Sequence, residues 1–369
     1  MKIIKLETQG FRNLADTRFL PGDEVNVIWG ENAQGKTNLL ESIWIFSGAK
    51  SFRGSKESDY IGFDKEITRL DLTFHAGGRE QTAQLVFAQD GRKVLLNGIK
   101  QERLSSLSGS LRAVVFSPDH LELVKQGPKE RRRLLDVSLC QAYPKYGKIL
   151  ESYEKILKQR AVLLKDAAAH SQVFDLLEVW DESLIEYGGY ISWMRAKYIA
   201  RLAGYASEAY MGITGGREMF SARYDASCGK IEPAWGRKEV GEILRAAVRR
   251  NRLEDIRQGR TGIGPHRDDI EILIGDKSAR AFGSQGQQRS CVLALKLAEC
   301  RLLEEGAGEP PIVLLDDVMS ELDAGRRRYL LTQLTGKQVI ITCCDPDTLA
   351  VTGNSRVFYM KRGELAMDN

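Results

Sequence analysis

The sequence predicts an α/β protein in which an inserted helical lobe interrupts one larger domain. Three observations support this fold class. Short β-rich runs fill the first third of the chain, the stretch from Tyr146 to Met211 has no proline and almost no β pattern, and short apolar strands alternate with helices in the last third. Such alternation indicates a mainly parallel sheet covered on both faces. We expect residues 1–118 and 262–369 to form two halves of the larger domain, and residues 119–261 to form the lobe.

The composition fits this size and limits the functional classes. The chain has 369 residues, of which 43% are hydrophobic, enough for one large domain and a smaller lobe. It has no run of about 18 apolar residues and no signal-peptide pattern, so we expect no membrane span and a cytoplasmic location. The six cysteines contain no CxxC pair, which favours reduced thiols over zinc or disulfides. A net charge of +4 says little about nucleic acid, so that argument depends on local clusters.

The first third is predicted to be β structure. The dipeptide Asp90-Gly91 separates two β-rich runs and is a strong hairpin signal. The predicted strands are Met1–Glu7, Glu24–Trp29, Arg69–Phe74, Ala83–Ala88, Lys93–Leu96 and Leu111–Phe116.

The middle of the chain is predicted to be helical. Gly127-Pro128 followed by KERRRLLD indicates a helix start, because proline is favoured in the first turn. Apolar residues then recur every seven positions, which indicates an antiparallel helical hairpin. The aromatic members could be a base-stacking platform, but their helical spacing favours core packing. The recurring residues are Leu150, Leu157 and Leu164, then Leu177, Leu184, Ile191, Tyr198 and Tyr205, with Trp180, Tyr187 and Met194 three positions after the first three of the second series.

The last third returns to alternating helices and strands. Helices are predicted over Arg289–Leu303 and Arg326–Leu334. Buried strands are predicted over Ile312–Leu315 and Gln338–Thr342, and an edge strand over Val357–Met360.

A phosphate-binding loop follows the strand that ends at Trp29. Residues 30–37 read GENAQGKT, a full match to GxxxxGK[ST], and a predicted helix follows. Backbone N–H groups of such a loop surround phosphates, and the helix N-terminus adds partial positive charge. Lys36 would neutralise the β- and γ-phosphates of ATP, and the Thr37 hydroxyl would bind Mg²⁺. The candidate nucleotide ligands are Gly30, Glu31, Asn32, Ala33, Gln34, Gly35, Lys36 and Thr37; the alternative is a chance glycine loop before a helix.

A second candidate element is an apolar strand that ends in two acids. Residues 312–317 read IVLLDD, and ligands of open α/β sheets bind at the carboxyl ends of strands. Asp316 would hold Mg²⁺ through its water shell, and Asp317 would orient or deprotonate the attacking water. Apolar strands often end in acids by chance, so this motif gains its weight from the phosphate-binding loop.

Two further loops resemble those of ABC-type ATPases. Residues 282–289 read FGSQGQQR and resemble the signature loop, with Ser284, Gly286 and Gln287 as candidate nucleotide ligands. In that family the contacted phosphate belongs to ATP on the other subunit, which implies an ATP-dependent homodimer with two shared sites. Residues 320–323 resemble the D-loop. The alternative for residues 282–289 is a glycine- and glutamine-rich loop that caps a helix.

Within that superfamily the resemblance is to the RecF family, and it covers essentially the whole chain. Three stretches carry it: KLETQGFRNL with Phe11-Arg12-Asn13 at its turn, FSPDHLELVKQGPKERRRLLD from Phe116 to Asp136, and GIGPHRDDIEI from Gly262 to Ile272. The first is shared with SMC and Rad50 heads, whereas the other two are particular to RecF-like proteins. The implied fold is an ABC-type P-loop ATPase head with an inserted, antiparallel coiled-coil-like helical lobe.

The resemblance also implies an activity and partners. It implies ATP-dependent dimerisation on DNA at gaps or single/double-strand junctions. It further implies cooperation with RecR and, through RecR, with RecO. The implied role is recombinase loading in recombinational repair, replication restart and the SOS response. The expected enzyme is a weak, DNA-dependent ATPase. Two departures favour slow hydrolysis: Asp317 stands where related heads usually have glutamate, and Thr342-Cys343-Cys344-Asp345 replaces the usual switch histidine. Each of the four histidines is expected to be a surface or core residue, and His266, within the RecF-like GPHRDD stretch, is the candidate exception.

DNA phosphates require local positive charge, and two clusters provide it. A solvated charged face is the alternative, and it is favoured in the second cluster by the nearby residues Glu239, Glu242, Glu254 and Asp255. The run Arg326–Arg328 follows the D-loop-like segment and could instead serve the dimer interface. The first cluster is Lys125, Lys129, Arg131, Arg132 and Arg133, and the second is Arg245, Arg249 and Arg252.

Other functions remain open at this point. An ABC-type transporter subunit would share the nucleotide motifs but would not need the heptad lobe. A P-loop small-molecule kinase would not need the signature-like loop. A non-hydrolysing nucleotide-sensing switch is compatible with Asp317.

Overall fold

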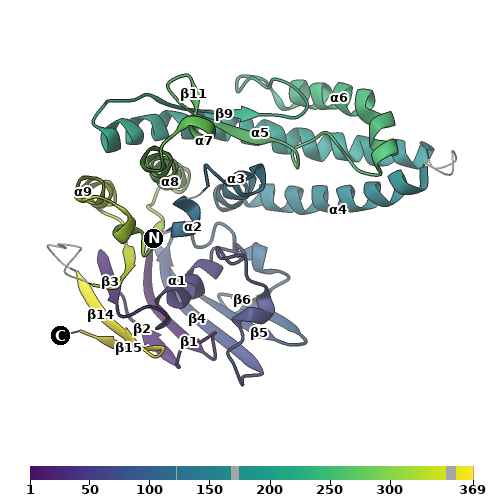
Figure 1. Cartoon of the computed structure of the whole chain (residues 1–369). Helices are drawn as coiled ribbons and strands as arrows, with labels where there is room; N and C mark the ends of the chain where they lie inside the picture. Colours follow the sequence, from purple (N-terminus) through teal and green to yellow (C-terminus); the bar gives the residue numbers. More distant parts are fainter. Residues whose placement is uncertain (122, 168–173, 346–354, 369) are drawn as a thin grey trace. The chain divides into compact units, whose positions relative to one another are not determined.

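The computed structural model describes residues 1–121, 123–167, 174–345 and 355–368 (Figure 1). The chain forms two compact units: unit 1 comprises Met1–Glu122, Gly212–Gly215 and Val292–Asn369, and unit 2 comprises Leu123–Met211 and Gly216–Cys291. Unit 1 thus combines both ends of the chain. Residues 262–291, which we placed with the larger domain, lie in unit 2.

Unit 1 contains an antiparallel sheet whose strands all come from the first third of the chain. Its strand order is β2-β1-β4-β5-β6-β7. The predicted hairpin is confirmed, because β5 and β6 pair up to Ala88 and Gly91 around the turn. The strands are β1 Lys2–Gln9, β2 Thr17–Phe19, β4 Ile67–Ala76, β5 Arg79–Ala88, β6 Gly91–Leu96 and β7 Ile99–Gln101.

The second sheet of unit 1 is mainly parallel, as the alternating pattern predicts. Its order is β15-β14-β3-β13-β12-β8, and only the β14–β15 pair is antiparallel. The prediction of an edge strand at Val357–Met360 is wrong, because β14 pairs with β3 on one side and β15 on the other. The strands are β3 Val25–Trp29, β8 Ala113–Phe116, β12 Ile312–Asp316, β13 Val339–Cys343, β14 Arg356–Lys361 and β15 Glu364–Met367.

Helices of unit 1 follow the strands that carry the candidate motifs. Helix α1 (Lys36–Ile45) follows β3 and contacts β12 and β13, and its apolar residues Leu40 and Ile43 are fully buried. Helix α9 (Ala324–Gln333) follows β12, and the Asp323 side chain caps it by accepting from the N–H of Arg326. The remaining short helices are η1 Glu57–Tyr60, η2 Leu104–Leu107, α2 Pro118–Leu121 and η4 Val318–Glu321.

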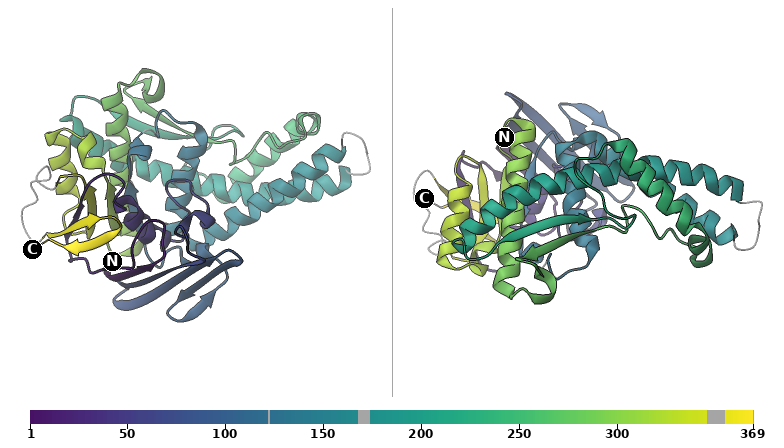
Figure 2. Two further views of the ribbon diagram at one scale, coloured as in Figure 1. Left: turned by 60° about the horizontal axis from the view of Figure 1, so that its bottom comes forward. Right: turned by 90° about the horizontal axis from the view of Figure 1, so that it is seen from above.

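Unit 2 is dominated by long helices (Figure 2). Helix α3 begins at Pro128, as predicted, and ends at Ala142. Helices α4 (Pro144–Ala167) and α5 (Phe174–Thr214) run antiparallel, which confirms the helical hairpin, and α6 (Arg237–Gln258) contacts α4. Helix α8 (Gln285–Ala307) crosses from unit 2 into unit 1 at residue 292. A three-stranded sheet and short helix α7 complete the unit: β9 Phe220–Asp225, β10 Asp269–Ile274, β11 Lys277–Ser278 and α7 Ala279–Phe282.

The buried face of α4 differs from the predicted heptad series. Leu150, Leu157 and, on α5, Tyr205 are only half-buried, whereas Leu164 and the rest of the α5 series, Leu177, Leu184, Ile191 and Tyr198, are buried as predicted. The fully buried heptad on α4 is instead Tyr146, Tyr153 and Arg160. Arg160 is tolerated because its guanidinium lies 2.7 Å from a carboxylate oxygen of Asp181 and 2.7 Å from one of Asp255. A charge pattern that looks solvent-facing in sequence therefore lies inside the core.

The RecF-like stretch 262–272 explains why residues 262–291 pack in unit 2. Tyr224 and Ser227 donate hydrogen bonds to the buried carboxylate of Asp268. His266 accepts a hydrogen bond from the Tyr153 hydroxyl at 2.8 Å, while its Nε2 donates to the Thr261 carbonyl at 3.1 Å. Burial lowers the pKa of His266 to about 4, so this imidazole is a neutral structural group.

Candidate nucleotide site and basic clusters

The loop between β3 and α1 is held in a shape that requires glycine at two positions. Gly30 has φ +153° and Gly35 has φ +111°. A Cβ atom on Gly30 would lie 2.3 Å from the Met360 carbonyl oxygen on β14, and one on Gly35 would lie 2.9 Å from Leu14. Because α1 starts at Lys36, its N-terminal N–H groups face the loop, as an anion-binding loop requires.

Lys36 lies inside this loop. Its side chain is 7% exposed, and its ammonium donates to the carbonyl oxygens of Gly30 at 2.5 Å and Glu31 at 2.7 Å. The thiol of Cys344, which follows β13, lies 4.0 Å from the ammonium and 3.1 Å from the Asn32 side chain. A buried positive charge bordered by backbone donors is suited to a polyphosphate.

Thr37 and Asp316 come together at the carboxyl end of β12. The Thr37 hydroxyl donates to an Asp316 carboxylate oxygen at 2.8 Å, and the Thr342 hydroxyl on β13 donates to the same oxygen at 3.0 Å. Burial raises the pKa of Asp316 above its ordinary value, and the two hydroxyls oppose that shift. A hydroxyl and a carboxylate at this separation form a donor pair that suits Mg²⁺ carrying waters and phosphate oxygens, so the residues present fit the predicted ion.

Asp317 follows in a backbone conformation that is uncommon for a non-glycine residue. Its φ is +51°, and its N–H donates to the Thr342 hydroxyl at 3.1 Å. Its side chain is half-buried, and burial raises its pKa while Lys36 opposes the shift. A carboxyl group with a raised pKa close to the lysine of the candidate phosphate-binding loop is chemically suited to accept a proton from water.

Sequence reasoning assigned no role to three polar residues that contact the loop or the helix after it, Asn13, Asn38 and Arg53. The Asn13 amide donates to the Ala33 carbonyl at 3.2 Å and accepts from Asn38 at 2.6 Å, and Arg53 donates to Asn38 at 2.9 Å. The Gln34 side chain accepts from the N–H of Arg362 at 2.6 Å, which makes it a support of the loop. The Phe11-Arg12-Asn13 turn was visible in the sequence, but the residues that Asn13 contacts are distant in the chain, so this support of the loop could not be predicted.

Arg12 from the same turn also has a structural partner. It forms an ion pair with the fully buried carboxylate of Glu41 on α1 at 2.7 Å. The turn therefore fixes both the phosphate-binding loop and the helix that follows it.

The signature-like loop lies in unit 2, at the start of α8. Ser284 is exposed, its hydroxyl accepts from the N–H of Gln287 at 3.3 Å, and its own N–H donates to the Gln287 side chain at 2.7 Å. The Gln287 amide also donates to Glu218 at 2.6 Å, whereas Gly286 is half-buried in the first turn. The loop thus does cap a helix, and that helix is 23 residues long with an exposed serine at its N-terminus. Capping and phosphate contact are compatible uses of the same group.

The first basic cluster separates into buried and exposed members. Arg131 is 3% exposed, forms an ion pair with Asp269 at 2.7 Å, and donates to carbonyls of the preceding loop. Arg131 is therefore a structural residue, and the prediction that it contacts DNA is not supported by its burial. Arg132 donates to the Asp268 carbonyl, and Arg133 lies 3.7 Å from Glu130. Lys125 and Lys129 are exposed.

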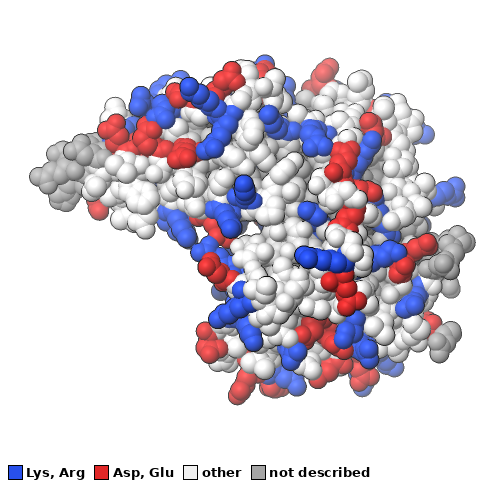
Figure 3. Space-filling view, turned by 180° about the vertical axis from the view of Figure 1, so that it is seen from behind, with Lys and Arg blue, Asp and Glu red and all other residues white. Residues whose placement is uncertain are grey.

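The second basic cluster faces acids on α5. Arg245 forms an ion pair with Glu182, Arg249 lies 3.7 Å from the same carboxylate, and Arg252 lies 3.7 Å from Asp181. The predicted helical face is real, but its charge is largely compensated. Figure 3 shows acidic and basic side chains interspersed over one face of the molecule. These ion pairs favour the alternative that the second cluster is a solvated charged face.

Comparisons with known proteins agree over nearly the whole chain. Residues 2–365 match the family model of the RecF/RecN/SMC N terminal domain. The chain is 36% identical over 371 residues to the DNA replication and repair protein RecF of Ruminiclostridium cellulolyticum, covering 99% of each, and 38% identical over 367 residues to that of Shouchella clausii, covering 98% of each. Among the described helices, none is long and apolar enough to cross a membrane.

Solved structures give the same result. The structure of the recombination mediator protein RecF-ATP in the RecFOR pathway superposes with a TM-score of 0.93 at 35% identity, covering 100% of this chain and 98% of that one. An Smc head domain of Pyrococcus furiosus, at 17% identity and a TM-score of 0.55, shares the fold. These similarities confirm the ABC-type ATPase head with a helical insertion.

Proposed function

The chain belongs to the RecF family of DNA replication and repair proteins, and we propose that it binds ATP with Mg²⁺ and dimerises on DNA in response. The observation that carries this proposal is the meeting of Thr37 and Asp316, 2.8 Å apart, beside the buried Lys36. The solved relative that was determined with ATP supports the choice of nucleotide.

Each residue at this place has a distinct task in the proposal. Lys36 would neutralise the β- and γ-phosphates, and the backbone N–H groups from Gly30 to Thr37 would surround them. Thr37 and Asp316 would hold the magnesium ion, which supplies charge neutralisation when bound. Asp317 would hold the attacking water and accept its proton.

The second half of the site would come from another copy of the chain. Ser284, Gly286 and Gln287 would contact the γ-phosphate bound by the partner chain, so that two ATP molecules join a symmetric dimer. Residues 262–291, although they pack in unit 2, would then serve the ATPase head. The dimer would bind gapped or junction DNA, cooperate with RecR and indirectly RecO, and assist recombinase loading during repair, replication restart and the SOS response.

Sedimentation of the full chain with and without ATP and gapped DNA tests this function. We expect a monomer without nucleotide and a dimer with ATP, with DNA favouring the dimer. A monomer under every condition would contradict the proposal.

Asp317→Asn is expected to separate nucleotide binding from hydrolysis. Binding of ATP and dimerisation should persist, because Asp316 and Thr37 still hold the metal, whereas turnover should fall about 10²–10⁴-fold through loss of the proton acceptor. Steady-state phosphate release and sedimentation of the same sample measure both effects. Asp316→Asn is the matched control, since it should impair metal-dependent binding.

A second candidate function is a non-hydrolysing nucleotide switch. It is favoured by the shorter Asp317 side chain and by the thiol of Cys344, 4.0 Å from Lys36, which lies in the stretch that replaces the usual switch histidine. Phosphate release that is equal for the wild type and Asp317→Asn would support the switch.

The exposed lysines of the first cluster are the proposed DNA contacts. The double variant Lys125→Ala/Lys129→Ala should weaken binding to all DNA sequences alike and reduce the slope of log K against log salt by about two units. The matched control is Arg245→Ala/Arg249→Ala, which removes charges already facing Glu182 and should change the slope less. Fluorescence titrations at several salt concentrations measure both. A larger slope change in the control would assign the contact to the second cluster.

A further inference from the structure

The sheet of unit 2 has an open edge at β9. The strand order is β11-β10-β9, so β9 pairs with a neighbour on one side only among the described strands. The Gly275 N–H donates to the Met219 carbonyl at 2.7 Å, and these two residues stand directly opposite each other in the continued register. Hydrogen-bonded pairs alternate in antiparallel strands, so Ser221 and Arg223 bond to β10.

The same alternation leaves the backbone of Ala222 and Tyr224 directed away from β10. No described residue hydrogen-bonds their N–H groups. The edge therefore presents donors and acceptors at the spacing of a peptide strand.

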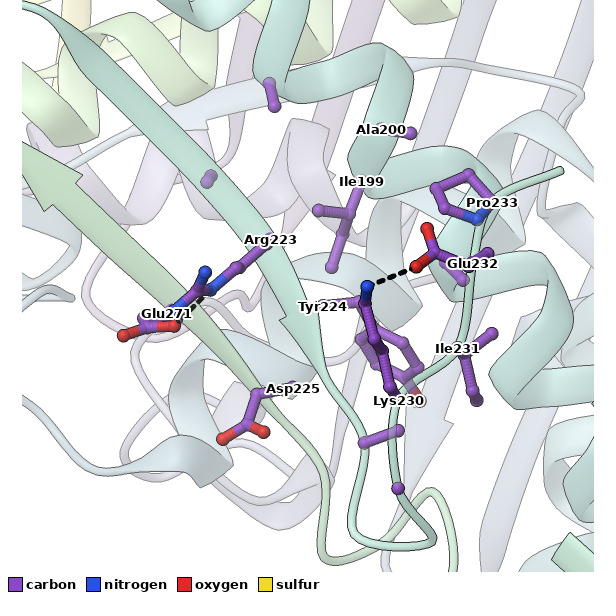
Figure 4. Close-up of a pocket in the computed structure, with 15 residues that line it drawn as sticks. Ile199, Ala200, Arg223, Tyr224, Asp225, Lys230, Ile231, Glu232, Pro233 and Glu271 are labelled. Carbon is purple, nitrogen blue, oxygen red and sulfur yellow. Dashed lines mark hydrogen bonds and ion pairs between the residues drawn. The ribbon is translucent and has the colours of Figure 1, made fainter. Parts of the chain in front are cut away.

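A cavity of about 580 Å³ lies along this edge (Figure 4). One side is β9, a second is α5, and a third is the loop Gly229–Pro233. The α5 wall is built from three alanines, Ala196, Ala200 and Ala203, together with Ile199, and Ala222 faces the cavity from β9. The volume is within the range of ligand-binding cavities, and small side chains allow another backbone to approach closely.

The aromatic residues beside Ala222 are held in place by other contacts. Phe220 packs against Tyr210 of α5 with ring centroids 5.5 Å apart, and the Tyr224 hydroxyl donates to Asp268. The space at Ala222 is therefore bounded by fixed groups and is not filled by a simple rotation of either ring.

The charges around the cavity are paired except at one place. Arg223 forms an ion pair with Glu271, and Lys230 lies 2.5 Å from Glu232. The carboxylate of Asp225, exposed at the end of β9, forms no hydrogen bond or ion pair with a described residue, and only the Arg223 guanidinium, already paired with Glu271, interacts with it at longer range. The residue opposite it on β10 is Asp269, which is occupied by Arg131. This end of the cavity therefore favours a basic group.

We propose that the groove formed by β9, α5 and the loop Gly229–Pro233 binds an extended peptide segment of a partner protein by strand addition to β9. The backbone of the segment hydrogen-bonds Ala222 and Tyr224. Its small or β-branched side chains alternate toward the alanines of α5, and a lysine or arginine faces Asp225. Main-chain bonds supply affinity in this recognition mode, and alternate side chains supply specificity.

Selection from a phage-displayed library of random octapeptides on the full chain tests the proposal. Peptides that bind the Ala200→Trp variant are first removed from the library. The introduced indole fills the groove from an exposed position. We expect enrichment of alternating sequences that carry a basic residue, and at least about tenfold weaker binding of a synthetic winner to Ala200→Trp. Val179→Trp, on the same helix at a position 65% exposed and outside the groove, is the control and should bind normally. No enrichment over the filled variant would overturn the proposal.

Amide exchange and a charge swap locate the peptide. The winning peptide should slow exchange at Ala222 and Tyr224, whereas Ser221 and Arg223 are already protected by β10. Asp225→Lys should weaken binding about fivefold, and a peptide with glutamate in place of its basic residue should regain it. Unchanged exchange at both amides would contradict strand addition. Concentration-dependent dimerisation without peptide, lost in Ala200→Trp, would assign the groove to a second copy instead.

Discussion

Replacing Lys36 with methionine is expected to abolish ATP binding while the fold persists. The ammonium is the buried cation of the phosphate-binding loop, and charge-assisted hydrogen bonds to phosphate are lost without it. ATP binding should weaken by more than about a hundredfold, and ATP-dependent dimerisation should disappear with it. Calorimetric titration with ATP and sedimentation measure the two effects.

Thermal unfolding separates this effect from damage to the loop. Lys36→Met leaves the carbonyls of Gly30 and Glu31 without their donor, so a local cost of about 1–3 kcal/mol is expected. Lys93→Met removes the same charge from an exposed position on β6 and should leave both ATP binding and stability unchanged. Normal ATP affinity in Lys36→Met would remove the site assignment.

Ser284→Arg is expected to have the opposite pattern: ATP binding by the monomer persists, and dimerisation is lost. Lys36 is unchanged in the same chain, but bulk and positive charge enter the proposed phosphate contact. The serine also caps α8, and its removal alone costs about 1 kcal/mol. Ser284→Ala is the matched control, because it removes the cap without adding bulk and should reduce dimerisation much less.

Mixing Ser284→Arg with Lys36→Met chains distinguishes a shared site from two separate ones. Each mixed dimer would have one site with both defects and one site with neither. Weak ATP-dependent association should therefore return, because one ATP can still join the pair. Normal dimerisation of Ser284→Arg alone would instead favour a single-chain P-loop enzyme.

The loop conformation and the strand end of the candidate nucleotide site could be predicted from sequence because their determinants are local. Gly30 and Gly35 are required by positive φ angles within one loop, and α1 starts where Lys36 predicts. The acids at the carboxyl end of β12 were predictable for a similar reason, since a buried apolar strand must end where polar groups can emerge. Pro128 fixed the start of α3 through its own geometry.

Residues whose environment is set by distant segments could not be placed in this way. Arg131 and Arg160 look like surface charges in sequence, yet Asp269 in one case and Asp181 with Asp255 in the other draw them into the interior. Arg245 belongs to a basic face that α5 compensates with Glu182. No periodicity within one helix contains this information.

The sequence by itself determined the shape of the candidate phosphate-binding loop, the acidic strand end, the helical hairpin and the family, because backbone conformation and hydrophobic periodicity are encoded over a few adjacent residues. Only the tertiary structure decided that residues 262–291 pack in unit 2, that β15 and not β14 forms the sheet edge, and which basic residues remain exposed. These features depend on which strand pairs with which and on where a buried charge finds its partner. A charge is buried only where a partner offsets its loss of hydration, and that partner is chosen by the fold of the whole chain.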